Sequence, residues 1–269
     1  MIKLLLSFSL TLLVFILPFP SVSLATESNS AVDHTVVEKH INRLLNKKIE
    51  DSRPPVFPSP KKANVYLTFD DGPNEFTTIN LQTLKQYEVS GTFFFLGKHM
   101  KAHESIVKAV AKNGHYIGTH SMTHDKTKVY KSAESFIQEI NSGVSLIEQM
   151  TGHNPRLIRV PYGSKPHVTT AMKDKLIKQN YKLWDWDVDT NDWRYTDKQY
   201  KEIVKNVQLE TEKAYKSGDK DIIILLHDRS QTTKALPLII EWLQKEGYTL
   251  KTYEEDKHIV QNFLRDKSL

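Results

Sequence analysis

From residue 64 onward, short apolar runs alternate with longer amphipathic segments, and this alternation restricts the fold more than any other feature of the chain. The apolar runs, which are typical of β-strands, cover residues 64–69, 91–97, 115–119, 157–160, 181–186, 221–227 and 248–252. The amphipathic segments, which are typical of helices, cover residues 104–114, 133–152, 197–218 and 235–247. Near-continuous apolar strands that alternate with helices predict an α/β fold with a parallel sheet or a (β/α) barrel.

The first residues have the pattern of a secretory signal peptide. A lysine precedes the apolar run of residues 4–19, and small residues follow at Ser23 and Ala25. The run is short for a membrane span and prolines close it, so we expect cleavage after Ala25. Residues 1–25 therefore predict a secreted or cell-surface protein. If uncleaved, the N-terminus would instead hold the protein to the membrane or the wall.

Residues 26–62 connect this segment to the main domain. Apolar residues on one face of 35–50 predict a short helix, and the prolines of 51–62 predict a stiff linker. We expect this short N-terminal helical extension to precede one domain at residues 63–269. Whether the helix is a spacer or a wall-binding element is left open.

The chain of 269 residues contains no cysteine. This composition excludes a disulfide framework, a thiolate nucleophile and a cysteine metal site. The net charge is +5 and no basic block with interleaved aromatic residues stands out, so no nucleic acid partner is expected. A moderate positive charge suits an anionic surface such as a cell wall or lipid headgroups.

Polar residues capable of chemistry follow five of the predicted strands. They are Asp70–Asp71, 120-HSMTH-124, 159-RVPYG-163, 187-DVDTNDW-193 and His227–Asp228. In a (β/α) barrel the reactive side chains stand at the C-terminal ends of several strands. One such segment is weak evidence, but five at equivalent positions predict an active site at this end of the sheet.

His120 and His124 are spaced so that a helix or a tight loop can present both imidazoles to one metal ion. Alone, such a pair is more often two surface histidines, and 70-DDGP-73 alone is more often a turn. Asp70 or Asp71 can supply the carboxylate of a site with two histidines and one carboxylate. Because adjacent side chains diverge on a strand, one aspartate can bind the ion while the other accepts a proton from a polarised water.

His227 ends the apolar run 222–226, where a histidine is more often part of the core. Its place among the other strand ends favours a general acid instead. Either Asp189 or Asp192 is available to orient and charge its ring. Arg159 is a natural partner for a carboxylate that must stay ionised.

The turn at 161–163 is either an ordinary loop or the source of a backbone N–H for an oxyanion. Trp184, Trp186 and Trp193 are expected mostly in the core. One of them is expected to form a wall for a sugar ring or an acetyl methyl group.

Five motifs occur in order: 68-TFDDGP-73, 120-HSMTH-124, 159-RVPYG-163, 189-DTNDW-193 and 225-LLH-227. On these motifs the chain resembles the polysaccharide deacetylase family, carbohydrate esterase family four with its NodB-like domain, from about Asn64 to Tyr253. The segment 91–97 also resembles the family's second strand. The resemblance implies a distorted (β/α) barrel of about seven strands and a divalent metal ion, usually zinc. It also implies hydrolysis of N- or O-acetyl groups on a polysaccharide.

By position in the motifs, the resemblance implies a role for each residue of the metal site. Asp71, His120 and His124 would be the metal ligands, and Asp70 would be the catalytic base. Arg159 would hold Asp70.

The same resemblance implies the remaining roles. His227 would be the catalytic acid, with Asp192 beside it. The backbone N–H of Tyr162 would serve the oxyanion, and Trp193 and Leu225 would contact the acetyl group of the substrate.

Two departures from the family pattern concern loop shape and substrate fit. Val160 stands where proline is common, and residues 125–132 lack the short turn that usually follows the second histidine. The expected substrate is N-acetylglucosamine of peptidoglycan, because an exported protein without cysteines suits a Gram-positive cell wall. N-acetylmuramic acid, chitin oligosaccharides, an exopolysaccharide and acetylxylan are alternatives with the same chemistry.

Two classes of protein are rivals to a deacetylase. A non-catalytic glycan-binding protein on the same fold would be marked by a lost base or ligand, and here every reactive position is filled. A phosphodiesterase with two metal ions would need more histidines and carboxylates than these motifs offer. The expected partner is therefore an acetylated cell-wall glycan, and a monomer is expected.

Overall fold

The computed structural model describes residues 61–269. The predicted signal peptide at 1–25, the helix at 35–50 and all but the last two residues of the linker lie outside the described residues. These assignments and the domain boundary at residue 63 stay predictions. Within residues 61–269, no helix combines the length and the apolar character that are needed to cross a membrane.

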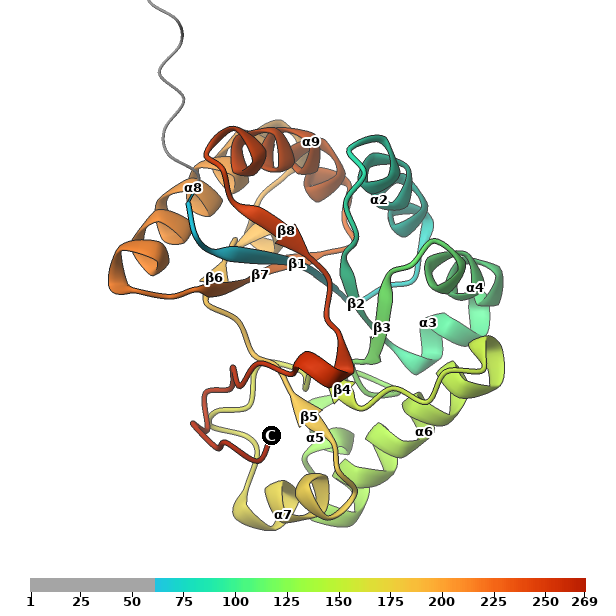
Figure 1. Cartoon of the computed structure of the whole chain (residues 1–269). Helices are drawn as coiled ribbons and strands as arrows, with labels where there is room; N and C mark the ends of the chain where they lie inside the picture. Colours follow the sequence, from blue (N-terminus) through green and yellow to red (C-terminus); the bar gives the residue numbers. More distant parts are fainter. Residues whose placement is uncertain (1–60) are drawn as a thin grey trace, which may run out of the picture. The chain divides into compact units, whose positions relative to one another are not determined.

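The strands of the described chain form one parallel sheet that curls around an interior, with helices packed on its outside (Figure 1). The bounds are β1 (Asn64–Asp70), β2 (Thr92–Phe95), β3 (Tyr116–Thr119), β4 (Leu157–Ile158), β5 (Lys182–Leu183), β6 (Val188–Asp189), β7 (Asp221–His227) and β8 (Thr249–Lys251). Their spatial order is β5-β4-β3-β2-β1-β7-β6, and β8 pairs with β1. Because β5 and β6 are not paired with each other, the barrel is open at that point, and the predicted distorted (β/α) barrel is confirmed.

Strand β1 lies in the centre of the sheet and uses both of its edges. Strand β7 pairs with its whole length, and Asp70 lies opposite His227. On the other edge, β8 pairs with residues 64–66 and β2 pairs with residues 68–70. Residues 65–70 of β1 are all buried, and burial of both faces of the sheet explains the near-continuous apolar sequence of the strand. The C-terminal ends of β2, β1 and β7 therefore lie side by side.

Alternate residues of β1 point to opposite faces of the sheet, as in any strand. Val65, Leu67 and Phe69 belong to the large core between the sheet and the outer helices. Tyr66 belongs to a separate aromatic cluster with Phe94, Tyr116, Trp184 and Tyr253. By this alternation Asp70 shares the face of Tyr66, so its carboxylate lies on the inner side of the barrel.

Eight α-helices of the described chain surround the sheet. Their bounds are α2 (Glu75–Gln86), α3 (Gly97–Ala102), α4 (Glu104–Lys112), α5 (Lys126–Val129), α6 (Ala133–Thr151), α7 (Thr170–Lys178), α8 (Tyr200–Ser217) and α9 (Ser230–Lys245). The predicted helices correspond to α4, α6, α8 and α9. Helix α9 begins at Ser230, before the predicted start at residue 235. Its first turn is polar, so the apolar pattern on which the prediction rested starts too late.

After β8, residues 255–269 cross to the open side of the barrel, next to β5. The indole Nε1 of Trp184 donates to the carbonyl oxygen of Ile259 at 2.8 Å, and Asp185 N–H donates to Gln261 O at 2.8 Å. Leu269 is fully buried in the apolar cluster beneath α5, α6 and α7. This segment therefore replaces part of the pairing that β5 and β6 lack.

Candidate active site

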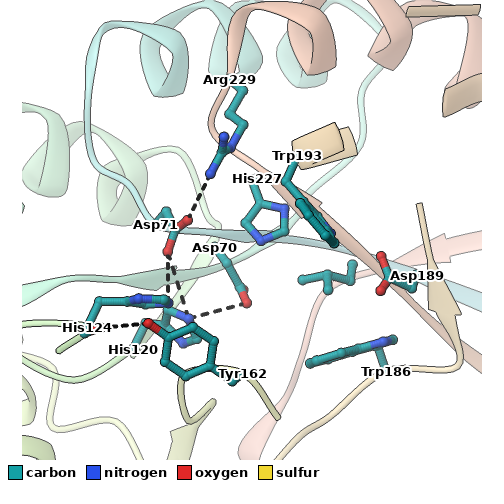
Figure 2. A pocket seen from close by; sticks show the side chains of 11 residues that line it. Asp70, Asp71, His120, His124, Tyr162, Trp186, Asp189, Trp193, His227 and Arg229 are labelled. Carbon is teal, nitrogen blue, oxygen red and sulfur yellow. Dashed lines mark hydrogen bonds and ion pairs between the residues drawn. The ribbon is translucent and has the colours of Figure 1, made fainter. Parts of the chain in front are cut away.

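A pocket of about 430 Å³ opens at the C-terminal ends of the central strands (Figure 2). It is lined by Trp186, Arg229 and residues from all five motifs: Asp70, Asp71, His120, His124, Tyr162, Asp189, Trp193, Leu225 and His227. Arg159 and Asp192 lie behind the wall of the pocket and are fully buried. The structure thus brings every predicted site residue together around one cavity, while their individual roles stay predictions.

Asp71, His120 and His124 each offer one ligand atom, and these atoms lie within 4.8 Å of one another. Asp71 Oδ1 is 3.5 Å from His124 Nε2 and 3.9 Å from His120 Nε2. The other ring nitrogen of His120, Nδ1, lies 2.8 Å from the carbonyl oxygen of Arg159. A backbone carbonyl behind an imidazole is the usual way in which a metal-binding histidine is oriented. Nε2 of His120 is therefore directed at the pocket.

The side chains of this triad fit a divalent ion. Within the described chain, the buried Oδ1 of Asp71 has no hydrogen-bond partner, although it faces two imidazoles. Burial, followed by the neighbouring His120, lowers the pKa of His124 to about 4, so this ring is neutral and able to coordinate. Two imidazoles and one carboxylate with open positions suit a catalytic divalent cation. Of the two adjacent aspartates, Asp71 is the one that the geometry places in the triad.

Asp70 is 2% exposed and is fixed by Arg159. Arg159 Nη1 donates to Asp70 Oδ1 at 3.0 Å and to Thr68 Oγ1 at 2.6 Å. Its Nε and Nη2 donate to the carbonyl oxygens of Trp184 and Asp185 at 3.1 and 2.9 Å. The guanidinium is thus held at every nitrogen, and it holds one oxygen of Asp70 while Asp70 also faces the pocket.

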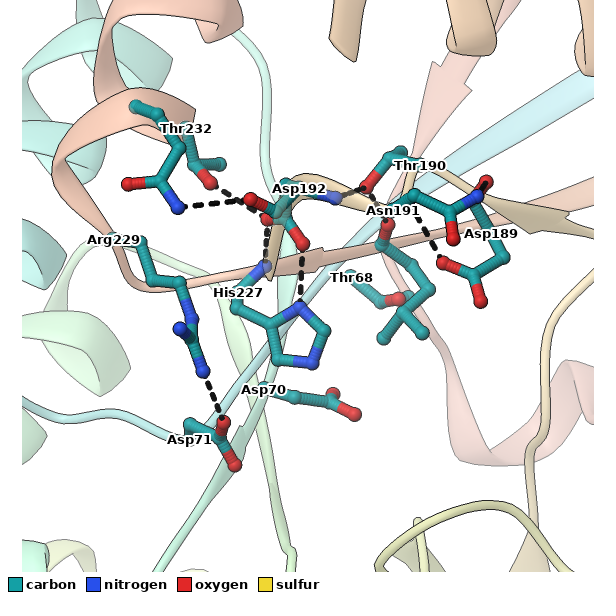
Figure 3. A network of polar contacts seen from close by, with 12 residues as sticks. Thr68, Asp70, Asp71, Asp189, Thr190, Asn191, Asp192, His227, Arg229 and Thr232 are labelled. Carbon is teal, nitrogen blue, oxygen red and sulfur yellow. Dashed lines mark hydrogen bonds and ion pairs between the residues drawn. The ribbon is translucent and has the colours of Figure 1, made fainter. Parts of the chain in front are cut away.

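His227 ends β7, and Asp192 holds its ring (Figure 3). His227 Nδ1 lies 2.7 Å from Asp192 Oδ1, and the N–H of His227 donates to Asp192 Oδ2 at 2.7 Å. Burial lowers the pKa of His227, but the charge and hydrogen bond of Asp192 outweigh burial and raise it to about 9. Asp189 lines the pocket but accepts the N–H of Asn191 at 2.9 Å instead. Asp192 is therefore the carboxylate that orients His227.

Tyr162 lies in a tight turn whose backbone is left-handed, with φ of 66°. Its hydroxyl donates to the carbonyl oxygen of His124 at 3.1 Å, and the two rings are 4.7 Å apart. In the described part of the chain, the N–H of Tyr162 donates to no protein acceptor. This donor is consequently available to a ligand in the pocket.

Left-handed backbone is concentrated in the motifs. Eight non-glycine residues of the described chain have positive φ, and five of them are in the motifs: Asp71, Ser121, His124, Tyr162 and Asn191. Each such residue costs about 1–3 kcal/mol, and clusters of them mark functional sites. The strain falls on the loops that carry the predicted chemistry.

The apolar part of the pocket comes from Trp186, Trp193 and Leu225. Trp193 is 46% exposed at the rim, whereas Leu225 is buried at the base. Trp184 is fully buried among other aromatic rings. Two of the three tryptophans considered in the sequence thus line the cavity, and one belongs to the core.

Two residues that directly follow the last motif were given no role from the sequence: Asp228 was noted only as a polar residue at a strand end, and Arg229 was not noted. Arg229 lines the pocket, and its Nη2 lies 3.6 Å from Asp71 Oδ2. Asp228 is buried and accepts hydrogen bonds from Thr77 Oγ1 at 2.6 Å and from Asn80 Nδ2 at 2.8 Å. Burial raises the pKa of Asp228 to about 7. Their position next to His227 was the available signal.

Phe263 has no such signal, because it lies far from every motif in the sequence. Its ring is 5.1 Å from that of Trp186, edge to face, and it packs over Gly163. A Cβ atom at Gly163 would lie 3.1 Å from Phe263 and 3.2 Å from Trp186. The N–H of Phe263 donates to Asp185 Oδ2 at 2.6 Å. The C-terminal segment thus supports both a wall of the pocket and the turn of Tyr162.

The chain is similar in sequence to known polysaccharide deacetylases. The family model described as polysaccharide deacetylase matches residues 58–183. A peptidoglycan-N-acetylglucosamine deacetylase of Bacillus cereus is 35% identical over 227 residues, covering 82% of this chain and 81% of that protein. The peptidoglycan-N-acetylmuramic acid deacetylase PdaC of Bacillus subtilis is 33% identical over 231 residues, covering 81% of this chain and 46% of that protein.

A solved structure agrees with these sequence relatives. The crystal structure of the polysaccharide deacetylase Bc1974 from Bacillus cereus matches with a TM-score of 0.72 at 36% identity. The match covers 77% of this chain and 100% of that one. Fold, motifs and relatives agree, and the chain belongs to the polysaccharide deacetylase family, the hydrolases of carbohydrate esterase family four.

Proposed function

We propose that this protein is a metal-dependent deacetylase that removes the acetyl group from N-acetylglucosamine units of peptidoglycan. One observation carries the proposal: the triad of Asp71, His120 and His124, with its unpartnered carboxylate oxygen, faces the same pocket as Asp70 and His227. The substrate is supported by a Bacillus cereus relative that is named a peptidoglycan-N-acetylglucosamine deacetylase.

Asp71, His120 and His124 would hold the divalent ion, which we propose to be zinc. When bound, the ion would supply Lewis-acid polarisation of a water molecule and of the acetyl carbonyl group. The side chain of Arg229 lies on the outer oxygen of Asp71, so Oδ1 remains the ligand atom that faces the histidines.

The chain's own residues would move the protons. Asp70, aimed by Arg159, accepts a proton from the attacking water. The N–H of Tyr162 donates to the oxygen on which negative charge develops. His227, kept protonated by Asp192, gives its proton to the amide nitrogen as the C–N bond breaks. The products are acetate and a free amino sugar.

The apolar wall would select the acetyl group. Leu225 at the base of the pocket and Trp186 and Trp193 around it would offer an apolar surface for the methyl group. Because Trp193 is exposed at the rim, its ring is also able to contact the sugar.

Export places the enzyme beside its substrate. We propose that residues 1–25 direct the chain out of the cell, where it acts at the wall as a monomer. The apolar run and the small residues before position 26 support this location.

The proposed function is tested by measuring acetate released from peptidoglycan by the purified protein, with and without a chelator. Chitin oligosaccharides, a de-N-acetylated control glycan and acetylxylan are assayed in parallel. We expect acetate from peptidoglycan, loss of it with chelator and recovery with zinc. Mass spectrometry of digested peptidoglycan then locates the free amine. Acetate release that continues after complete removal of metal from the protein would contradict the proposal.

N-acetylmuramic acid is the second candidate substrate, because the relative PdaC is named a deacetylase of that sugar. The same mass spectra distinguish the two sugars. Binding of peptidoglycan without acetate release, by a protein shown to contain metal, would favour the glycan-binding alternative.

A further inference from the structure

The 120–125 loop carries both histidines of the triad, and its carbonyl oxygens are held from one side by α3. Gly97 N–H donates to Ser121 O at 2.9 Å, and Lys98 N–H donates to Met122 O at 3.0 Å. These bonds fix two peptide groups of the loop but leave their N–H groups facing away from α3.

The N–H groups are taken by a single carboxylate on α6. Glu139 Oε2 accepts from Met122 N–H at 2.9 Å and from Thr123 N–H at 3.0 Å. The hydroxyl of Thr123 lies 3.1 Å from the same oxygen and 3.2 Å from Oε1. Hydrogen bonds to an ionised acceptor are roughly twice as strong as neutral ones. Glu139 therefore ties three donors of the segment between the two histidines to one helix.

The loop needs such support because its backbone is strained. Ser121 and His124 both have positive φ, 75° and 58°. Each costs about 1–3 kcal/mol and persists only where the surroundings determine the conformation. The donors that Glu139 accepts lie between these two residues.

Helix α6 is itself placed closely against β3, on the strand that leads into the loop (Figure 1). Gly143 follows Glu139 by one helical turn and so lies on the same face. A Cβ atom at Gly143 would collide with the hydroxyl of Thr119, the residue before His120. The absent side chain lets the helix approach, and this approach sets how far Glu139 reaches over the loop.

We infer that Glu139 is a positioning residue for the metal site, and the inference rests on the proposed metal-dependent function. Glu139 does not line the pocket and touches no reacting group. Through Met122 and Thr123 it sets the conformation that brings the rings of His120 and His124 to a centroid separation of 5.1 Å. Neutralising its carboxylate should therefore loosen the site before it unfolds the domain.

The test compares Zn²⁺ affinity in the full chain and two variants, Glu139→Gln and Glu139→Ala, by competition with a chromophoric chelator. Glu148→Gln is the matched control, since Glu148 lies on the same helix but is exposed. Loss of an outer partner of metal ligands typically costs on the order of 10–100-fold in metal affinity. We expect about tenfold weaker binding for the glutamine variant, a larger loss for the alanine variant and no change for the control.

Two further readouts separate positioning from general stability. The metal-free Glu139→Gln protein should unfold at nearly the same temperature as the wild type, and its Co²⁺ complex should show an altered visible absorption band. Zn²⁺ affinity and a Co²⁺ spectrum equal to those of the wild type would overturn the inference. A wild-type chain that binds no Zn²⁺ would overturn it together with the proposed metal site. Weakened Zn²⁺ binding with no acetate from any glycan would support it while contradicting the proposed substrate.

Discussion

The two walls of the pocket are built differently. One wall, the metal wall, consists of Asp71, His120 and His124. The ligand atoms of these three residues lie close together, and Asp71 Oδ1 has no hydrogen-bond donor in the described chain. The other wall, the proton wall, consists of Asp70 and His227. Each has a fixed, buried partner, Arg159 for Asp70 and Asp192 for His227. The first wall is arranged to receive a cation from outside, whereas the second is complete without one.

Backbone strain falls mostly on the metal wall: of the five motif residues with positive φ, only Asn191, next to Asp192, is on the side of the proton wall. Asp71, Ser121, His124 and Tyr162 surround the metal wall and have positive φ. Asp70 and His227 instead stand at the ends of β1 and β7, which pair along their whole lengths. Binding of a cation can offset strain in the loops, while the regular strands hold Asp70 and His227, the proposed proton-transferring groups, without a cation. The comparison teaches that metal and proton functions should be separable by mutation.

The largest effect is expected from removing a ligand on the metal wall. His120→Ala should abolish stable metal binding and lower acetate release by about 10³-fold or more, because the ion supplies several kcal/mol of transition-state stabilisation. Metal content and acetate release measured on the same sample check this. A variant that retains its metal and its activity would remove the distinction between the walls.

The next largest effect concerns the buried partner on the proton wall. Arg159→Leu removes the guanidinium that ties Asp70, Thr68 and two carbonyl groups together. Removing one partner of a buried ion pair typically destabilises a protein by about 3–5 kcal/mol. Urea unfolding of metal-free protein should show this loss. A change in the free energy of unfolding below about 1 kcal/mol is typical of a surface ion pair. It would contradict the interpretation that the buried pair of Arg159 and Asp70 stabilises the fold.

A smaller effect is expected from Asp192→Asn, which takes away the charge that raises the pKa of His227 to about 9. The alkaline limb of the rate profile should move to lower pH, and activity near pH 8 should fall on the order of 10²-fold, the lower end for general acid catalysis. The metal content should stay unchanged. A pH–rate profile that keeps its alkaline limb would show that another group is the acid.

The raised pKa of His227 also predicts that the stability of the fold depends on pH. Folding raises the pKa of His227 from 6.5 to about 9, so the folded protein binds this proton more tightly than the unfolded chain. The resulting stabilisation is complete below about pH 6.5 and is lost as the pH rises to about 9. Asp192→Asn should flatten this dependence in urea titrations across that range.

The smallest effect is expected from a substitution in the C-terminal segment 255–269, which supports the pocket from outside the motifs. Phe263→Ala should let Trp186 and the turn at Gly163 shift, with kcat/KM falling roughly tenfold because reacting groups are displaced. Phe263→Leu, which keeps most of the apolar volume, should recover part of the loss. Equal kinetics for both variants and the wild type would show that the segment only covers the barrel.

The sequence predicts the strands better than the helices. The long apolar runs of β1 and β7 are unmistakable, whereas β6 covers only Val188 and Asp189 and has no pattern of its own. Helix α2 is mostly polar, and its start depends on Asn74, whose side chain accepts the N–H groups of Phe76 and Thr77. Such capping is local and lacks the periodic signal on which helix prediction rests.

The sequence also predicts some residues of the candidate site and misses others. Residues in motifs at strand ends, such as Asp71 and His227, are predictable because topology brings strand ends together. Glu139 and Phe263 reach the site from a helix face and a distant segment, so only the folded arrangement identifies them. From the residues alone the choice between Asp189 and Asp192 stayed open, because both follow the predicted strand 181–186 by a few residues. The family resemblance favoured Asp192, and the structure places Asp192 on the ring of His227.

The most direct test of the two-wall account is a paired measurement on Asp70→Asn, which alters the proton wall and leaves the triad intact. Acetate release from peptidoglycan and bound metal are measured on the same purified sample. The account predicts one metal ion per chain, as in the wild type, with turnover lower by about 10²–10⁴-fold. Full turnover would contradict Asp70 as the base, and loss of the metal would contradict the separation of the two walls.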